Sequence, residues 1–114
     1  MGEGRLKHFG WGREGEGMTA EEVAATLDRY RRLFDVASFD EVAPPNLSEI
    51  KLRTPRIVAP LALVSCCSSE AYDRVAHTYG KSFSDYARGL VGHYDNAPDI
   101  VAYPRNEAEV TAVV

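Results

Sequence analysis

A stripe of apolar residues at helical spacing marks one long helix near the start of the chain. Its members recur every three or four residues, as one face of an α-helix requires. Thr19 and Glu22 form a capping box before it, and Met18 stands where it can pack against the first turn. The stripe consists of Val23, Leu27, Tyr30 and Phe34. The pattern therefore predicts a helix that begins after Thr19.

Capping residues predict two more helices in the second half of the chain. Ser69 precedes residues 70–79, which a glycine then ends. Ser82 and Asp85 repeat the cap spacing for a shorter helix that ends at Gly92. Both segments are therefore expected to be helical.

An apolar run between prolines predicts a short strand near the end of the sequence. Residues 100–103 lie between Pro98 and Pro104, and Asn106 with Glu109 then forms a capping pair for a further helix. The sequence stops after about two turns of that helix, and isolated helices so short are marginal in water. We therefore expect the chain to be a truncated piece of a larger protein.

The remaining segments are predicted to be irregular. Residues 1–17 contain six of the nine glycines and should form a loop or arm, which the rings of Phe9 and Trp11 would pin to a body larger than this chain. Residues 35–54 read as a connector that Pro-Pro keeps from being helical. Residues 53–64 are apolar but interrupted by prolines, which indicates a buried irregular segment or an edge strand.

Composition adds limits on function. The chain has 114 residues, a hydrophobic fraction of 45%, a charged fraction of 26% and a net charge of −4, which indicates one globular domain at most. No basic cluster interleaved with aromatics is present, so a nucleic-acid partner is not expected. No apolar run approaches the roughly 20 residues of a membrane span, and no secretory signal opens the chain. We expect a cytoplasmic protein.

No catalytic residue and no metal site can be assigned from the sequence. His8 and His93 have no second ligand at metal spacing. Cys66 and Cys67 are adjacent, which suits neither a zinc ribbon nor a cross-link between distant segments, so two buried free thiols are expected.

Arg74 and His77 lie one helical turn apart and could form a site pair. The alternative is a surface or interdomain turn in which Glu70 and Asp73 supply ion-pair partners. We favour the second interpretation.

Three segments together resemble a known protein family. Residues 7–12, Lys-His-Phe-Gly-Trp-Gly, are similar to a Lys-Trp-x-Gly-Trp-Gly opening, with a departure at Phe9. Residues 74–85 match Arg-x-x-His-x-x-Gly-x-Ser-x-x-Asp, with His77 at the histidine position. Residues 97–110 look like the strand and helix that open a flavin domain. The chain thus resembles the N-terminal portion of the alkyldihydroxyacetone-phosphate synthase branch of the FAD-linked oxidase superfamily, which includes vanillyl-alcohol oxidase.

The resemblance implies an incomplete α+β fold, in which an N-terminal helical arm precedes the first βα unit of a PCMH-type FAD-binding domain. Residues 1–67 would be the arm, helix and connector, and residues 68–114 the start of the FAD-binding domain. Tyr103 and Pro104 would border the cofactor, FAD. The main flavin loops, the substrate domain and the active site would lie beyond Val114.

Two functional hypotheses follow. In the first, the parent protein is an FAD-dependent oxidoreductase of the alkyldihydroxyacetone-phosphate synthase or D-2-hydroxyacid dehydrogenase type, and this chain alone is inactive. Its partners would be the remainder of the same polypeptide and a small-molecule substrate, and a homodimer is left open. In the second, the chain is a non-catalytic binding module that docks through its apolar helix and aromatic arm.

Overall fold

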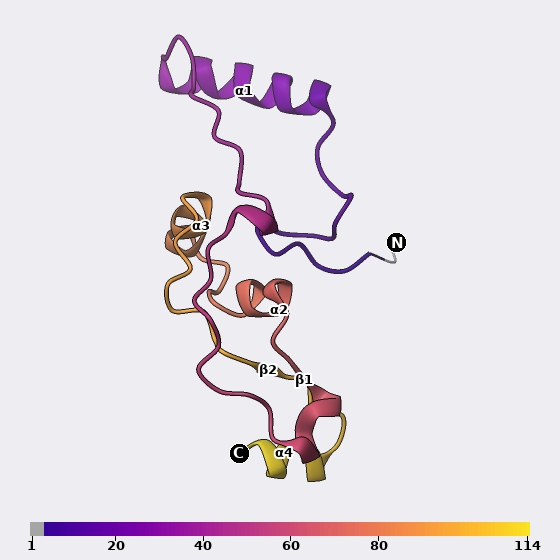
Figure 1. Ribbon diagram of the computed structural model, residues 1–114. Helices are drawn as coiled ribbons and strands as arrows, with labels where there is room; N and C mark the ends of the chain where they lie inside the picture. The colour runs from indigo at the N-terminus through magenta and orange to yellow at the C-terminus, as the bar shows by residue number, and fades with distance from the viewer. Residues whose placement is uncertain (1–3) are drawn as a thin grey trace. The chain divides into compact units, whose positions relative to one another are not determined.

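The computed structural model describes residues 4–114, which form two compact units (Figure 1). One consists of Trp11–Ala43 and the described part of Met1–Lys7. The other consists of His8–Gly10 and Pro44–Val114. Within residues 4–114, no helix has both the length and the apolar character needed to cross a bilayer.

A tight turn built by its own backbone precedes the long helix in the first unit. Leu6 and Arg13 form an isolated antiparallel bridge, and Lys7 N donates to Gly12 O at 3.0 Å. Gly12 has a φ of 84°, a conformation that residues with a Cβ rarely adopt. The side chain of Trp11 at this turn is 69% exposed, so its expected packing surface does not lie within the described chain.

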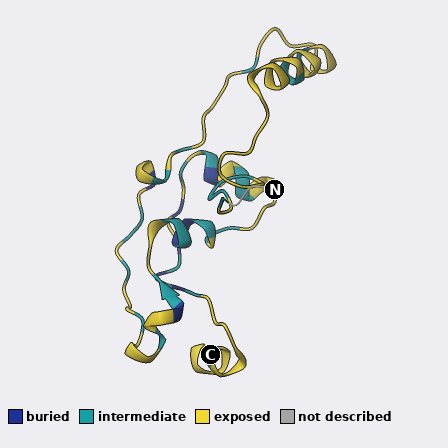
Figure 2. Cartoon of the chain, turned by 90° about the vertical axis from the view of Figure 1, so that its right-hand side faces the viewer, coloured by how far each residue is buried: buried dark blue, intermediate teal, exposed yellow. Residues whose placement is uncertain are grey.

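Helix α1, Ala20–Phe34, is the predicted long helix. Its capping box is confirmed, because Glu22 N donates to Thr19 Oγ1 at 3.2 Å and Thr19 N donates to Glu22 Oε2 at 2.8 Å. Asp35, with a φ of 51°, ends it. None of its residues is buried (Figure 2). The stripe predicted from the sequence therefore forms, but it lacks a covering surface in the structure.

The second unit contains short elements throughout. The predicted strand and the predicted helices of the second half are all present, with two additional 3₁₀ helices and one additional strand. In chain order they are the 3₁₀ helices Leu47–Glu49 and Leu61–Cys66, β1 Cys67–Ser68, α2 Ala71–Ala76, α3 Phe83–Leu90, β2 Val101–Ala102 and α4 Glu107–Val113.

Helix α2 is shorter than the predicted 70–79. Glu70, not Ser69, is the N-cap, and Glu70 N donates to the hydroxyl of Ser68 at 3.2 Å. At the other end, Thr78 Oγ1 donates to Arg74 O at 2.7 Å, which competes with continuation of the helical ladder. The prediction was therefore wrong by a few residues at its C-terminal end.

A two-stranded antiparallel sheet joins the middle of the chain to its end. Cys67 pairs with Ala102 and Ser68 with Val101. Tyr103 N extends the ladder by donating to Cys66 O at 2.7 Å. The sequence predicted β2 but not its partner β1, which follows directly on a 3₁₀ helix. Helices with this small sheet place the chain in the predicted α+β class.

The core of the second unit is small. Ile50, Val75 and Tyr94 are buried together, and the rings of Tyr79 and Tyr94 lie 5.4 Å apart. Residues 53–64 were expected to be a buried irregular segment or an edge strand. Residues 53–60 are irregular, as predicted, but the expected burial is wrong, since Val58 is 86% exposed. Pro60 is the N-cap of the 3₁₀ helix that follows, and its fixed φ suits a helical start rather than a strand.

Residues 44–67 belong to the same compact unit as residues 68–114. The family resemblance predicted a domain boundary between residues 67 and 68. The start of an FAD-binding domain at residue 68 stays a prediction.

Replacing Gly89 in α3 by alanine should destabilise the second unit. A Cβ there would lie 2.8 Å from the hydroxyl of Tyr94 and 2.9 Å from a ring carbon of Phe9. We expect a loss of about 1–3 kcal/mol from this overpacking, which exceeds the gain of about 1 kcal/mol in helix propensity. Urea unfolding measures the change, with Ala87→Leu at an exposed position of the same helix as control. An unchanged midpoint for Gly89→Ala would contradict the expected clash.

Candidate functional site

The residue that the sequence placed beside a flavin, Tyr103, lies at the end of β2. Its hydroxyl donates to Asp73 Oδ1 at 2.5 Å, and Ser68 Oγ donates to Asp73 Oδ2 at 2.5 Å. The ring of His77 stands edge-on to the Tyr103 ring, with 5.6 Å between centroids. Residues from β1, from α2 and from the position directly after β2 thus meet around one carboxylate. Pro104 follows Tyr103 and is exposed.

Asp73 changes the chemistry of this phenol. Burial, the hydrogen bond to Asp73 and the charge of that carboxylate raise the pKa of Tyr103 to about 12. The phenol therefore stays neutral at physiological pH and acts as a hydrogen-bond donor. Because Asp73 accepts the hydrogen bond from the Tyr103 hydroxyl, the part of Tyr103 that remains available for contact is its ring. The residue as a whole is 45% exposed.

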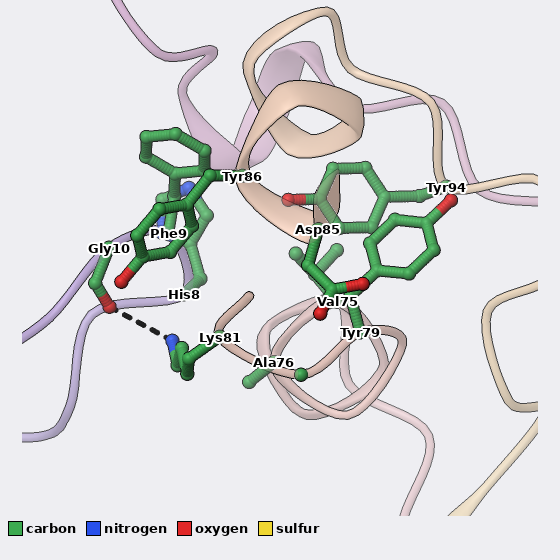
Figure 3. Close-up of a pocket in the computed structure, with 11 residues that line it drawn as sticks. His8, Phe9, Gly10, Val75, Ala76, Tyr79, Lys81, Asp85, Tyr86 and Tyr94 are labelled. Atoms are coloured by element: carbon green, nitrogen blue, oxygen red, sulfur yellow. Dashed lines mark hydrogen bonds between the residues drawn. The ribbon is translucent and has the colours of Figure 1, made fainter. Parts of the chain in front are cut away.

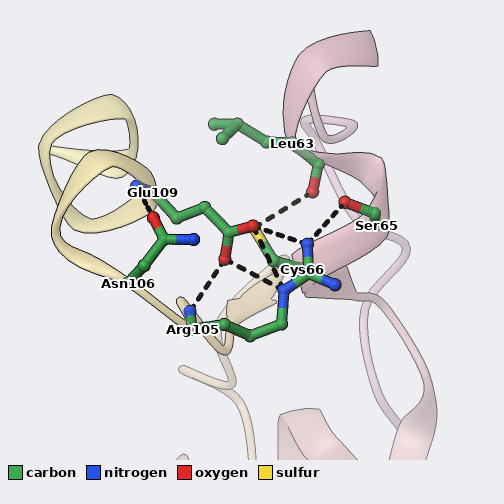
Figure 4. Close-up of polar contacts among 6 residues, drawn as sticks. All are labelled: Leu63, Ser65, Cys66, Arg105, Asn106 and Glu109. Atoms are coloured by element: carbon green, nitrogen blue, oxygen red, sulfur yellow. Dashed lines mark hydrogen bonds and ion pairs between the residues drawn. The ribbon is translucent and has the colours of Figure 1, made fainter.

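A second polar cluster fixes the start of α4 (Figure 4). Arg105 Nη2 donates to Glu109 Oε1 at 2.5 Å and to Ser65 Oγ at 3.2 Å, and Arg105 N donates to Glu109 Oε2 at 2.7 Å. The hydrogen bonds from Arg105 lower the pKa of Glu109. Asn106 Oδ1 accepts from Glu109 N at 2.9 Å, as its predicted capping role requires. The cluster joins α4 to the 3₁₀ helix Leu61–Cys66.

Both cysteines are free, as predicted. Cys66 is buried and Cys67 is partly buried. Cys66 Sγ lies 3.4 Å from Leu63 O, and burial together with the neighbouring Cys67 raises the pKa of the Cys66 thiol. A thiol held neutral in this way is a poor nucleophile, so the structure gives Cys66 a packing role.

Arg74 and His77 do not act as a pair. Arg74 is only 4% exposed, and its guanidinium donates to Pro98 O at 2.7 Å and to Arg53 O at 2.8 Å. The expected surface ion pair is therefore wrong for Arg74, because backbone carbonyls satisfy it inside the unit. His77 is exposed and its Nδ1 lies 2.8 Å from Asp73 O.

A buried carboxylate, Asp99, is the residue that sequence analysis missed. It is 8% exposed and lies 3.2 Å from both Arg53 Nη2 and Arg56 Nε. Burial opposes its ionisation, but the hydrogen bonds from Arg56 and the charges of Arg53 and Arg56 outweigh it and lower the pKa of Asp99. In the sequence, only the spacing of Arg53 and Arg56, three residues apart, hints at this cluster. Asp99, the carboxylate that they bind, lies 43 residues after Arg56. This cluster joins the segment around Arg53 and Arg56 to the segment that leads into β2.

Near α3, a cavity of about 20 Å³ lies among aromatic residues (Figure 3). The ring of Phe9 packs on Tyr86 with 5.6 Å between centroids, and Lys81 Nζ donates to Gly10 O at 2.9 Å. Phe9 therefore packs on this chain, not on a larger body as the sequence suggested. A cavity of this volume holds about one water molecule, so it is not a substrate site.

The sequence analysis assigned no metal site to His8 or His93. His8 Nε2 lies 3.3 Å from Pro45 O, and the carbonyl of His93 accepts from the hydroxyl of Tyr79 at 2.5 Å. Among residues 4–114, no three His, Cys, Asp or Glu side chains gather as a metal site would require.

Removing the charge of Asp73 should lower the pKa of Tyr103 toward its ordinary value near 10. In the native chain the folded pKa lies above the unfolded one, so the stability from this pair is complete below about pH 10 and is lost as the pH rises to about 12. Titration of the Tyr103 ζ-carbon by NMR in Asp73→Asn measures the shift. Glu70→Gln, which removes a carboxylate from the same end of α2, is the control. Equal midpoints in Asp73→Asn and the native chain would refute the role of Asp73.

Comparisons with known proteins show similarity to alkyldihydroxyacetonephosphate synthase. No protein-family model matches the chain. A stretch of 41 residues, 36% of the chain, is 42% identical to alkyldihydroxyacetonephosphate synthase of Dictyostelium discoideum and covers 7% of that protein.

Two solved structures of alkyldihydroxyacetonephosphate synthase, from different crystal forms, match 95% of the chain with TM-scores of 0.71 and 0.69, at 19% and 21% identity. The chain spans about a quarter of the length of each. The fold of this chain is thus that of one part of alkyldihydroxyacetonephosphate synthase, and the resemblance found in its sequence is confirmed.

Proposed function

We propose that this chain is the N-terminal segment of an FAD-dependent oxidoreductase similar to alkyldihydroxyacetonephosphate synthase. The observation that carries the proposal is the match of 95% of the chain to about a quarter of that enzyme, with a TM-score of 0.71. Within such an enzyme the second unit supplies the first βα unit of the flavin domain, β2 followed by α4. The first unit supplies the arm and helix that precede it.

Tyr103 and Pro104 would border the cofactor in this proposal. Tyr103 stands where β2 ends, its hydroxyl is fixed by Asp73, and its ring is partly exposed. Both residues are open to solvent, whereas bound cofactors are usually enclosed over most of their surface. These residues therefore fit a border of an FAD site and not a complete one, and further protein surface must enclose the flavin. The chain alone would neither hold FAD nor catalyse a reaction.

Two reactions remain open for the parent enzyme. One exchanges an acyl for an alkyl chain on a glycerone-phosphate ester, and the other oxidises a D-2-hydroxyacid. The described residues of this chain contain no group that distinguishes the two substrates.

The alternative function is a non-catalytic binding module. Its support is the exposed apolar face of α1, together with Trp11 at 69% exposure. Such surfaces mark interaction sites when they are contiguous. The alternative and the enzyme proposal differ in whether a flavin-binding loop accompanies this chain.

The coding sequence after Val114 provides the first test. We expect a Gly-Gly-Gly-Thr-Ser type loop within about 30 residues, the length of a βαβ unit, because backbone N–H groups of such a loop hold the flavin pyrophosphate. A stop codon directly after Val114 would refute the enzyme proposal for this product. The isolated chain should be colourless in visible absorbance, and a yellow preparation would contradict the border role.

In the protein that carries this loop, Tyr103→Ala should weaken FAD binding by roughly 2- to 10-fold, the range of one aromatic contact. Flavin fluorescence on dilution measures the release of the cofactor. Phe83→Ala in α3, which also removes an exposed ring, serves as the matched control. Identical release from both variants and the native enzyme would remove Tyr103 from the cofactor border.

A further inference from the structure

The ring of Tyr103 is fixed by contacts at its backbone, its edge and its hydroxyl. Its backbone N donates to Cys66 O at 2.7 Å, and its hydroxyl donates to Asp73 Oδ1 at 2.5 Å. The ring of His77 stands edge-on to it, with 5.6 Å between centroids. The phenol is therefore held at both of its ends, and the hydrogen bond to Asp73 is what holds the far end.

The carboxylate of Asp73 is itself held in place by its neighbours. Ser68 Oγ in β1 donates to Asp73 Oδ2 at 2.5 Å, and Glu70 N donates to the same hydroxyl at 3.2 Å. Asp73 lies in the first turn of α2, whose N-cap is Glu70. Its two oxygens thus have different partners, because Oδ2 is anchored to β1 and Oδ1 accepts from the phenol of Tyr103.

A ring that is fixed in advance binds a ligand more tightly than a mobile one. Immobilising a flexible side chain on binding lowers an affinity by roughly 2- to 10-fold. Because the hydrogen bond to Asp73 already fixes the phenol, a ligand that contacts the Tyr103 ring avoids this loss. Tyr103 is 45% exposed, so its ring is open to such a contact. Asp73 can therefore act on a ligand through Tyr103.

We propose that Asp73 is a positioning residue of the cofactor border, and that its hydrogen bond holds the ring of Tyr103 in the orientation that contacts FAD. The inference rests on the proposed function, because it takes Tyr103 as part of that border. The hydrogen bond, and not the negative charge of the carboxylate, positions the ring. An amide oxygen at residue 73 therefore serves as well as a carboxylate oxygen.

The orientation of the ring can be measured in the 114-residue chain, independently of FAD. Three-bond scalar couplings from the backbone N and C′ to the ring Cγ of residue 103 report its rotamer about χ1. The native chain and Asp73→Asn should show a single rotamer, whereas Asp73→Ala and Tyr103→Phe should show averaged couplings. Averaged couplings in the native chain, or a single rotamer in both Asp73→Ala and Tyr103→Phe, would overturn the proposal.

In the protein that carries the flavin loop, flavin fluorescence on dilution measures the effect on FAD binding. Asp73→Ala and Tyr103→Phe should each weaken binding about 2- to 5-fold, although Tyr103→Phe keeps the ring. The double variant should bind no more weakly than either single variant, because both changes remove the same hydrogen bond. Asp73→Asn keeps an acceptor oxygen and should change the binding by less than about twofold.

Asp85→Ala is the matched control for the loss of a carboxylate. Asp85 also lies in the first turn of a short helix, α3, and accepts from a serine hydroxyl, that of Ser82, at 2.7 Å. This variant should leave FAD binding unchanged. Equal weakening by Asp85→Ala and Asp73→Ala, or native binding by Tyr103→Phe, refutes the positioning role and leaves the border role of Tyr103 standing. Native binding by Tyr103→Ala refutes the border role itself, and the positioning role with it.

Discussion

A buried guanidinium, that of Arg74, joins three segments that are distant in sequence. From α2 it donates to Arg53 O at 2.8 Å and to Pro98 O at 2.7 Å. Arg53 in turn donates to Ala97 O at 2.9 Å. A buried arginine is tolerated only when its donors are satisfied, and these carbonyls belong to irregular backbone that would otherwise lack partners. The position of the chain that enters β2 therefore depends on this side chain.

The candidate site depends on the same constraint. Two strands of two residues each supply too little pairing to hold a sheet on their own. Arg74 positions Pro98, β2 begins at Val101, and the ladder then places Tyr103 beside Asp73 of α2. The cluster of Arg105 and Glu109 fixes the start of α4 beyond it. A small polar framework thus does the positioning that a larger hydrophobic core performs in bigger domains.

Apolar surface is abundant on both units. The core of the second unit is small, while Val58 and Leu61 are 86% and 93% exposed. Under the proposed function, the rest of the parent enzyme would cover surface of this kind. The face of α1 is exposed as well, and its rings of Tyr30 and Phe34 are 44% and 62% exposed.

The sequence by itself determined the elements that local chemistry specifies. Thr19 and Ser82 bond to backbone groups within three residues, so the starts of α1 and α3 could be read directly from the sequence. The strand before Tyr103 and the family resemblance followed from contiguous patterns. Only the tertiary structure decided that Arg74 is buried, that Asp99 meets Arg56 and that Asp73 holds the phenol of Tyr103. These contacts join residues 21 to 43 positions apart, and neither spacing nor propensity encodes which distant backbone carbonyl or carboxylate a side chain will reach.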